Sequence, residues 1–386
     1  MAAPASADMT DRERLRQAVD HLLASQSPSG FFLYDFDFLV GRSVAGDNIV
    51  RQAGTGYFLA EYYLHASDPR VRGAVERTLD QLGKRSLPIG KSWLQSAIEQ
   101  TRILSIPIGR YKLRSGLERF GLLYRPSGDG KVISLDGRYL TASTGATAVA
   151  LLAELQYQQA TADQRFSALR AAWVKGLLSA RIPGAGFRIT PHLIDDTPYY
   201  DGEAWLALAY FDSLFPGDRT VGPTLKSLDS YLMQRYATEV TTGFYQWGAM
   251  AAARRFKATS DPRFVTFIGA QARALLDAPG GDRWRGNNPC ASIEGLATAA
   301  AVLRAQASTD RTLLARIEER IREDMAVIRQ LQVAPNATRL EFAEGIYLVS
   351  PRLRDFSGAF LEGRFRPSTR VDATAHCISA FVKLAG

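Results

Sequence analysis

Cysteine, histidine and long apolar runs are scarce in this chain of 386 residues, which has two cysteines and four histidines. Two cysteines without a CxxC pair cannot form a zinc site by themselves. The longest apolar stretch, Ala204 to Phe211, is much shorter than the roughly 18 to 20 residues that a membrane-spanning helix needs. No GxSxG, HExxH, P-loop or dinucleotide-binding glycine motif occurs in a suitable context. We therefore expect no membrane span, no metal and no cofactor.

Basic residues outnumber acidic residues by 47 to 39, and the formal net charge is +8. A basic surface suits nucleic acid, anionic lipid or an acidic polymer. The lysines and arginines are scattered, however, and no block of about five or six basic residues marks a nucleic-acid-binding arm. The densest stretch, 102–125, is interleaved with apolar residues, as in folded structure. We expect no nucleic-acid partner, and an acidic polymer stays open.

Small residues dominate residues 2–7, as at the start of an exported chain whose leader has been removed. This segment lacks the basic and apolar regions of an intact signal peptide. We expect a flexible tail over residues 1–9 and a periplasmic or secreted protein, with a cytoplasmic protein as the alternative. Cys290 and Cys377 form either one disulfide or two buried thiols that act as small apolar groups, and the pattern slightly favours the thiols.

Helices of two kinds alternate along the chain. The string SDPR at 67–70 recurs at 260–263, and each copy starts an amphipathic helix with a capping Ser or Asp and a proline in the first turn. The segments before them, such as 48–63, are rich in Ala, Gly and aromatic residues and are apolar on several faces, as enclosed helices are. Enclosed helices are predicted to start near Asn48, Ser143, Tyr200, Tyr245, Ala291 and Asp372. One-sided helices are predicted over 12–24, 71–82, 162–179, 222–235, 264–276 and 311–331.

Strict alternation of these two kinds predicts an all-α protein, a closed (α/α)6 toroid of six helical hairpins that forms a single domain over 10–386. Two stretches, 86–140 and 333–366, break the rhythm, and their alternating apolar residues indicate short β insertions. Gly-Phe pairs precede several enclosed helices, as at 30–31 and 186–187. There the glycine permits a tight bend, and the aromatic ring fills the space between hairpins.

Three segments near the starts of enclosed helices carry a family resemblance: DNIVRQAGT at 47–55, YYDGEA at 199–204 and TRVDATAH at 369–376. They resemble motifs of bacterial six-hairpin α/α-toroid proteins. That superfamily includes glycoside hydrolases, polysaccharide lyases and uronyl epimerases. The resemblance implies the toroid fold and polysaccharide chemistry, without selecting one reaction.

The enclosed helices of a toroid point the same way, so the loops that enter them converge on one mouth. Polar groups in their first turns then meet around one pocket, where the positive helix ends favour anionic groups. Alignment of the enclosed helices by their apolar runs puts Glu203, Glu294 and His376 at comparable depth. The candidate catalytic residues are Asp196, Glu203, Glu294 and His376. The candidate substrate-binding residues are Asp47, Arg51, Gln52, Tyr199, Tyr200, Asp201, Tyr245, Trp247, Arg370 and Asp372.

Four carboxylates lie within the nine residues from Asp195 to Glu203. Glycoside hydrolysis needs one protonated and one ionised carboxyl group, and crowding raises one pKa because like charges resist joint ionisation. The alternative is an acidic loop whose carboxylates cap a helix. The tyrosine and tryptophan rings suit either sugar stacking or core packing. His376 is either an acid–base group or a structural imidazole.

Arg51 and Arg370 flank the same mouth if the ring closes between its first and last hairpins. A pair of guanidinium groups can clamp a carboxylate of an acidic polysaccharide. Equally, the two arginines can pair with Asp47 and Asp372 across the seam of the toroid.

The leading hypothesis is a glycoside hydrolase that cuts a bacterial polysaccharide, for which the arginines favour an acidic one. Its acid–base pair is drawn from Asp196, Glu203 and Glu294, and the resemblance favours inversion at the anomeric carbon. A uronate-specific lyase or epimerase that uses Tyr200 or His376 is the first alternative. A non-catalytic polysaccharide-binding or assembly protein is the second. The sequence does not predict the oligomeric state.

Overall fold

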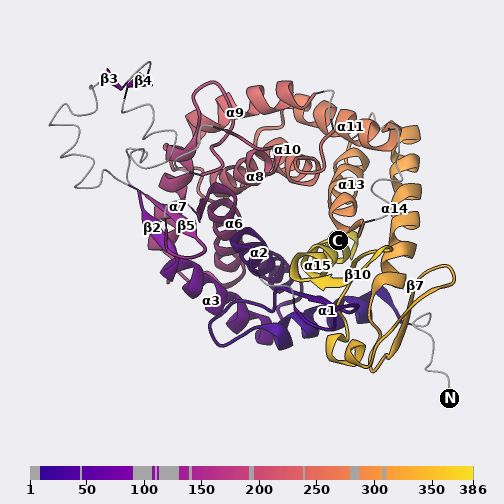
Figure 1. Cartoon of the computed structure of the whole chain (residues 1–386). Coiled ribbons are helices and arrows are strands. Elements are labelled where there is room, and N and C mark those ends of the chain that lie inside the picture. Colours follow the sequence, from indigo (N-terminus) through magenta and orange to yellow (C-terminus); the bar gives the residue numbers. More distant parts are fainter. Residues whose placement is uncertain are drawn as a thin grey trace.

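The helices form two concentric rings around a central axis (Figure 1). A computed structural model describes the chain over 9–43, 46–89, 107–108, 111–112, 130–138, 141–190, 195–237, 240–278, 287–306 and 310–385. The inner ring contains α2 (Ile49–Ala66), α6 (Thr144–Thr161), α8 (Pro198–Leu214), α10 (Tyr245–Thr259), α13 (Cys290–Arg304) and α15 (Val371–Ala385). The outer ring contains α1 (Asp11–Ser25), α3 (Pro69–Lys84), α7 (Ser167–Ala180), α9 (Gly222–Arg235), α11 (Pro262–Asp277) and α14 (Arg311–Leu331).

Each inner helix packs against the next, and α15 packs against α2, so that the inner ring is closed. The outer helices α3, α7, α9, α11 and α14 each follow an inner helix and pack on it. The sixth pair joins distant parts of the chain, because α1 packs on α15. This arrangement is a six-hairpin α/α toroid, and the predicted all-α fold is confirmed.

The observed helices differ little from the predicted ones. The predicted starts of the enclosed helices fall within two residues of the observed starts. The largest difference among the outer helices is in α7, which was expected from residue 162 and begins at Ser167. Ala162 adopts a left-handed conformation with φ 57° and ends α6, so the residues after it form a turn.

Composition explains why one set of helices is enclosed and the other is not. Helix α6 is buried without interruption from Thr144 to Tyr157, because its small side chains let neighbours approach from every side. Helix α14 instead buries one stripe that includes Leu313, Ile317 and Ile328, and its other faces are polar. Such a stripe is the pattern of a helix that covers a core from outside.

Two glycine bends set the path of the chain into inner helices. Gly30 has φ +97°, and a Cβ on it would lie 2.4 Å from the carbonyl oxygen of Arg77. Gly358 has φ +88°, and a Cβ there would lie 2.1 Å from the carbonyl oxygen of Gln17. Only glycine fits such close approaches of two backbones. The aromatic residues that follow these bends, including Phe360, are buried.

Short antiparallel strands decorate the toroid. In the first insertion, β2 (Ser86–Pro88), β5 (Lys131–Ser134) and β6 (Ala142–Ser143) form one sheet, and β3 (Pro107–Ile108) pairs with β4 (Tyr111–Lys112). Within that insertion the structure describes residues 86–89, 107–108, 111–112 and 130–138, and the others lie outside the described residues. In the second insertion, β7 (Arg339–Ala343) and β8 (Ile346–Val349) form a hairpin, as expected, and β9 (Leu361–Gly363) pairs with β10 (Arg366–Arg370). Of the predicted tail over 1–9, the structure describes only Met9.

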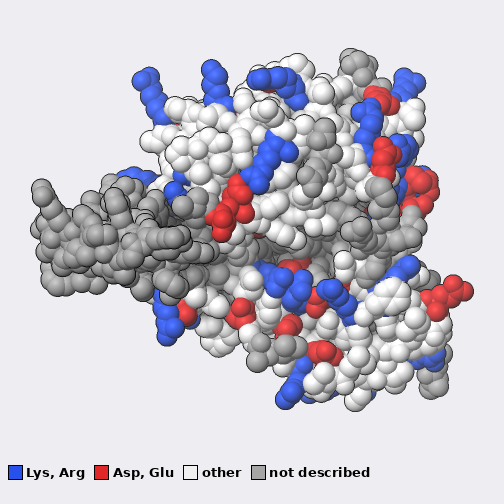
Figure 2. Space-filling model, turned by 45° about the horizontal axis from the view of Figure 1, so that its top comes forward, with Lys and Arg blue, Asp and Glu red and all other residues white. Residues whose placement is uncertain are grey.

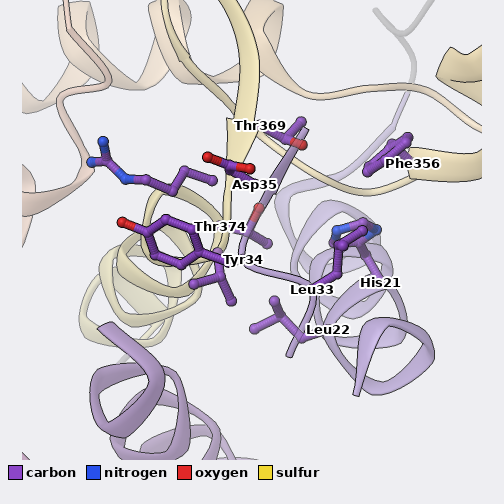
Figure 3. A pocket seen from close by; sticks show the side chains of 10 residues that line it. His21, Leu22, Leu33, Tyr34, Asp35, Phe356, Thr369 and Thr374 are labelled. Atoms are coloured by element: carbon purple, nitrogen blue, oxygen red, sulfur yellow. The ribbon is translucent and has the colours of Figure 1, made fainter. Parts of the chain in front are cut away.

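The seam where the two ends of the chain meet is tightly packed. Strand β1 (Asp35–Asp37) pairs with β10, with Asp35 opposite Arg370. Figure 3 shows Tyr34 and Asp35 close to Thr369 and Thr374. The cavity between these segments has a volume of about 10 Å³, which is room for one water molecule at most.

A disulfide between Cys290 and Cys377 joins α13 to α15. The slight preference for two free thiols was therefore wrong. Cys290 is the first residue of α13 and Cys377 lies in the second turn of the adjacent inner helix α15, and their Cα atoms are 4.8 Å apart, which is within the range that a disulfide spans. Among the described helices, none combines the length and apolar character needed to cross a membrane.

His21 on α1 provides a test of the seam. Burial lowers the pKa of His21 to about 4, and its ring lies 5.9 Å from that of Phe356. The folded state therefore holds His21 neutral, so the protein loses stability as the pH falls from about 6.5, the ordinary pKa. Between pH 7 and pH 4 we expect wild type to lose about 1–2 kcal/mol more than His21→Leu, after allowance for partial solvent exposure.

The measurement is urea unfolding at both pH values, with His65→Gln as the control. His65 is an exposed residue at the end of α2, so its replacement should leave the pH dependence as in wild type. Equal losses in wild type and His21→Leu would contradict a neutral His21 at the seam.

Candidate active site in the mouth of the ring

A cavity of about 1080 Å³ opens where the first turns of the inner helices converge. Every inner helix contributes to its lining; for example, Arg51 comes from α2, Tyr200 from α8, Gln246 from α10, Ser292 from α13 and His376 from α15. In Figure 2, basic and acidic side chains lie side by side around a hollow in the surface. The convergence that the toroid predicts is therefore present.

An ion-pair network crosses the seam at one side of this cavity. Asp372 lies 3.1 Å from Nε of Arg51 and accepts a hydrogen bond of 2.9 Å from Nη2 of Arg370. Arg370 also lies 2.6 Å from Oε2 of Glu362. Burial alone would raise the pKa of Asp372, but the two guanidinium groups outweigh it and lower that pKa. Asp372 is therefore an ionised carboxylate at neutral pH.

Glu203 on α8 is the opposite case, an acid held in its neutral form. Its side chain lines the cavity, yet the residue is only 3% exposed. Within the described part of the chain, its Oε2 atom has no hydrogen-bond partner. Burial raises the pKa of Glu203 well above its ordinary value. Gly145 makes room for it, because a Cβ at that position would lie 2.4 Å from Oε2.

His376 and Glu294 form a buried acid–base pair. Nδ1 of His376 lies 2.6 Å from Oε1 of Glu294, and Glu294 is fully buried. Burial raises the pKa of Glu294, although His376 opposes this. The Glu294 carboxylate in turn raises the pKa of His376, against the effect of burial. Since Nδ1 is engaged by Glu294, Nε2 is the nitrogen that can exchange a proton with a ligand in the cavity.

Aromatic rings cover part of the cavity wall. Tyr199 at the rim is 48% exposed, whereas Trp247 on α10 lies deeper and is 4% exposed. The hydroxyl of Tyr200 accepts a hydrogen bond of 3.2 Å from Oγ of Ser143, and burial raises its pKa. Rings of this kind can stack on sugar faces, and of Tyr199, Tyr200 and Trp247 it is Tyr199 that is exposed.

Several predicted site residues lie outside the cavity lining because they hold the backbone. Gln52 is fully buried; its amide accepts from the Phe32 N–H at 2.9 Å and donates to the Phe32 carbonyl at 3.0 Å. It also donates to Asp47, an exposed residue, at 2.9 Å. Asp201 accepts from the backbone N–H of Phe187 at 2.8 Å. These side chains fix the segments that enter α2 and α8, and they lie outside the cavity lining.

The remaining predicted residues outside the lining are Asp196, Tyr245 and Glu294. Asp196 accepts a hydrogen bond of 3.1 Å from Nη2 of Arg235 on α9 and faces the outer ring. Tyr245 is 1% exposed and packs on Gly295. Glu294 reaches the cavity only through His376. Of the four candidate catalytic residues, Glu203 and His376 therefore line the cavity directly.

Two charged lining residues escaped the sequence analysis. Glu362 and Arg366 come from β9 and β10 in the second insertion, which was expected only to form a wall. The available signal was the alternation Arg366, Ser368, Arg370 in β10, since alternate residues of a strand share one face. No group of three or more His, Cys, Asp or Glu side chains in the described ranges is arranged to hold a metal ion.

Comparison with known proteins shows the fold. No protein-family model and no curated protein matches the sequence. The chain is similar to an inactive variant of the α-1,6-mannanase GH76A of Salegentibacter sp. HEL1_6 in complex with α-1,6-mannotetraose, with TM-score 0.61 and 11% identity over 98% of this chain and 99% of that chain. It is also similar to an endoglucanase of the termite Nasutitermes takasagoensis, with TM-score 0.57 and 13% identity over 98% and 99% of the two chains.

A sugar epimerase from a ruminal bacterium is a third similar structure, with TM-score 0.56 and 10% identity over 96% of this chain and 97% of that chain. These proteins share the six-hairpin α/α toroid, so the resemblance seen in the sequence is confirmed at the level of the fold. At such low identities the likeness carries no reaction from one chain to another.

The neutral state of Glu203 has a consequence for stability. A carboxyl whose pKa is raised by folding stabilises the protein less and less as the pH rises above its ordinary pKa near 4.5, because the unfolded chain ionises first. Glu203→Gln removes this effect. Relative to wild type, we expect the variant to become more stable between pH 5 and pH 7, by up to about 1.4 kcal/mol per pH unit.

Chemical denaturation of both proteins across that pH range tests this expectation. A constant difference in unfolding free energy across the range would mean that Glu203 is ionised in the folded state.

Proposed function

We propose that the protein is a glycoside hydrolase that binds and cleaves an oligo- or polysaccharide in the mouth of the toroid. The observation that supports this most is a neutral buried carboxyl, Glu203, that opens onto a large cavity also lined by ionised and aromatic groups. The cavity exceeds the roughly 300–1,000 Å³ of ordinary small-molecule sites. Extended ligands such as oligosaccharides suit a site of this size.

In this proposal Glu203 is the general acid. It donates its proton to the glycosidic oxygen as the bond to the anomeric carbon breaks. A second group must take a proton from the attacking water. Asp372 is a weak base because Arg51 and Arg370 hold its pKa down, so we assign this step to Nε2 of His376, supported by Glu294. Direct attack of water activated in this way inverts the anomeric centre.

A more specific form of the proposal is that the substrate is an acidic sugar polymer. The cavity lining contains three cationic side chains, those of Arg51, Arg366 and Arg370. It contains two ionised carboxylates, those of Glu362 and Asp372, since Glu203 is neutral. Arg51 and Arg370 are engaged at the seam, whereas Arg366 is 60% exposed and its Nη1 lies 3.8 Å from Glu362. Arg366 is thus the cation best able to meet a carboxylate or sulfate on a sugar.

The disulfide supports an oxidising location. Disulfides persist in the periplasm and outside the cell and are rare in the cytosol. We therefore propose that the protein works in the periplasm or as a secreted enzyme.

A uronate lyase or sugar epimerase is the second candidate. The His376–Glu294 pair favours it, since an imidazole backed by a carboxylate can abstract a proton beside a sugar carbonyl or carboxyl group. Tyr200 lines the same cavity. Product analysis separates the two reactions, because a lyase leaves an unsaturated sugar that absorbs ultraviolet light, an epimerase creates no reducing end, and a hydrolase creates a reducing end without absorbance.

Replacement of Glu203 tests the proposed acid. Glu203→Gln should lower kcat on a cleaved glycan by about 10²–10⁴-fold, the usual contribution of a general acid, with glycan binding retained. Asp196→Asn is the control; its carboxylate pairs with Arg235 away from the cavity, so the rate should equal that of wild type. Reducing ends are measured on neutral mannans and glucans and on acidic glycans. Undiminished cleavage by Glu203→Gln would remove Glu203 from the mechanism, and glycan binding without cleavage by wild type would favour a binding protein.

The pH dependence of kcat/KM provides a separate test. The base His376 must be neutral, so the rate rises with pH through its raised pKa. The acid Glu203 must be protonated, so the rate falls with pH through its raised pKa. We expect a bell-shaped profile centred well above the range of about pH 4–5 in which two unperturbed carboxyl groups would act. An optimum within that acidic range would contradict these roles.

A further inference from the structure

We propose that the Cys290–Cys377 disulfide is a positioning element of the cavity, which holds α13 and α15 in the register that brings Glu294 to His376. The inference rests on the proposed function, in which this pair handles a proton. It extends that function by assigning a role to a bond that no part of the hydrolytic scheme requires.

The two halves of the disulfide are adjacent to the two halves of the pair. Cys377 directly follows His376 in α15, and Cys290 precedes Glu294 by four residues in α13. Four residues are about one helical turn, so Cys290 and Glu294 share a face of α13. A covalent bond between the cysteines therefore limits relative sliding and rotation of the two helices at the level of the His376–Glu294 contact.

The disulfide also fixes part of the cavity wall through Asn288. Oδ1 of Asn288 accepts a hydrogen bond of 2.9 Å from the backbone N–H of Cys290. Its Nδ2 atom lies 3.3 Å from Sγ of Cys377 and donates to the carbonyl oxygen of Leu361 at 3.1 Å. The backbone N–H of Asn288 donates to the carbonyl of Glu362 at 2.7 Å. One side chain thus ties the disulfide to β9, whose Glu362 lines the cavity.

Chain connectivity explains why these helices benefit from a covalent bond. Cys290 and Cys377 are separated by 87 residues, which include α14 and the whole second insertion. Helix α15 has no following outer helix among the described residues and packs instead on α1 from the other end of the chain. Catalytic groups must be held within about 0.5 Å of their productive geometry, and a covalent bond between α13 and α15 near the mouth of the ring supplies such a restraint.

The charges around His376 make its pKa a suitable readout. Glu294 from α13, Asp372 from α15 and Arg370 from β10 act on the imidazole. The uncharged rings of Phe58 on α2 and Trp247 on α10 pack beside it. Their centroids lie 4.7 and 6.3 Å from the centroid of the His376 ring. Of the three charged groups, Glu294 is the one whose position relative to α15 depends on the disulfide. Loosening of the contact therefore lowers the pKa of His376, because the imidazolium loses its carboxylate partner while it stays buried.

The experiment compares the full chain with the double variant Cys290→Ser/Cys377→Ser. NMR titration of the imidazole signals measures the pKa of His376, which is assigned among four histidines with His376→Gln. We expect the double variant to be folded with a lower Tm, and the pKa of His376 to fall by about one unit or more. Activity on a cleaved glycan should fall by about 10- to 100-fold, as for other small misplacements of catalytic groups.

A matched control separates positioning from general loss of stability. Leu228→Ala removes a fully buried side chain from the outer helix α9 and lowers Tm without touching α13 or α15, so the pKa of His376 should stay as in wild type. A second variant, Cys290→Ala/Cys377→Val, fills the fully buried space with apolar groups and favours folding without the bond. An unchanged His376 pKa in a folded double variant overturns the proposal. Failure of both double variants to fold overturns it as well, since the bond then serves the fold as a whole.

The NMR readout uses no sugar, so the two proposals can fail separately. A lowered His376 pKa together with no cleavage of any glycan by wild type supports the positioning role and contradicts the hydrolase. Cleavage by wild type with an unchanged pKa in the variants contradicts the positioning role and supports the hydrolase.

Discussion

Helix α15 packs between α2 and α13 and on α1, and this packing turns a row of hairpins into a closed ring. The seam is reinforced on the cavity side by the ion pairs that join Arg51, Asp372 and Arg370. On the flank of α15 that faces α13, the disulfide attaches the two helices to each other. The cavity depends on this closure, because Arg370, Asp372 and His376 would otherwise lie far from the groups on α2 and α8.

Two acids in the cavity, Asp372 and Glu203, are held in opposite protonation states. Asp372 is kept ionised by two arginines, whereas Glu203 is kept neutral by burial, with no cation paired with it in the part of the chain that the structure describes. Burying a carboxyl without a partner costs free energy, and a protein selected only for stability would gain from an amide there. The persistence of an unpartnered acid at the wall of a large cavity is therefore the strongest physical argument for chemistry at this place.

The alternation of helices could be predicted closely because it depends on composition. Enclosed helices need small or apolar residues on all faces, as α6 shows, and covering helices need one stripe, as α14 shows. The ring itself followed from counting these helices. The state of the cysteines could not be decided in this way, because it depends on a distance between helices that lie 87 residues apart.

The site was predictable as a region and less so as a set of side chains. Membership of a first helical turn does not say which way a side chain points, and successive residues on a helix point about 100° apart. Gln52 and Asp201 therefore turned out to hold backbone groups of Phe32 and Phe187, while their neighbours Arg51 and Tyr200 face the cavity. Glu362 and Arg366 were missed because strands of an insertion carry them, and only packing reveals where an insertion folds back.

The pairing of α1 with α15 has a consequence for biosynthesis. Among the helices described here, α1 is synthesised first and its inner partner α15 is synthesised last. Ribosomes synthesise about 5–20 residues per second, so α1 and the apolar face of α2 wait tens of seconds for the helix that covers them. During that interval the growing chain exposes an apolar surface on which chaperones, or other copies of the chain, can act.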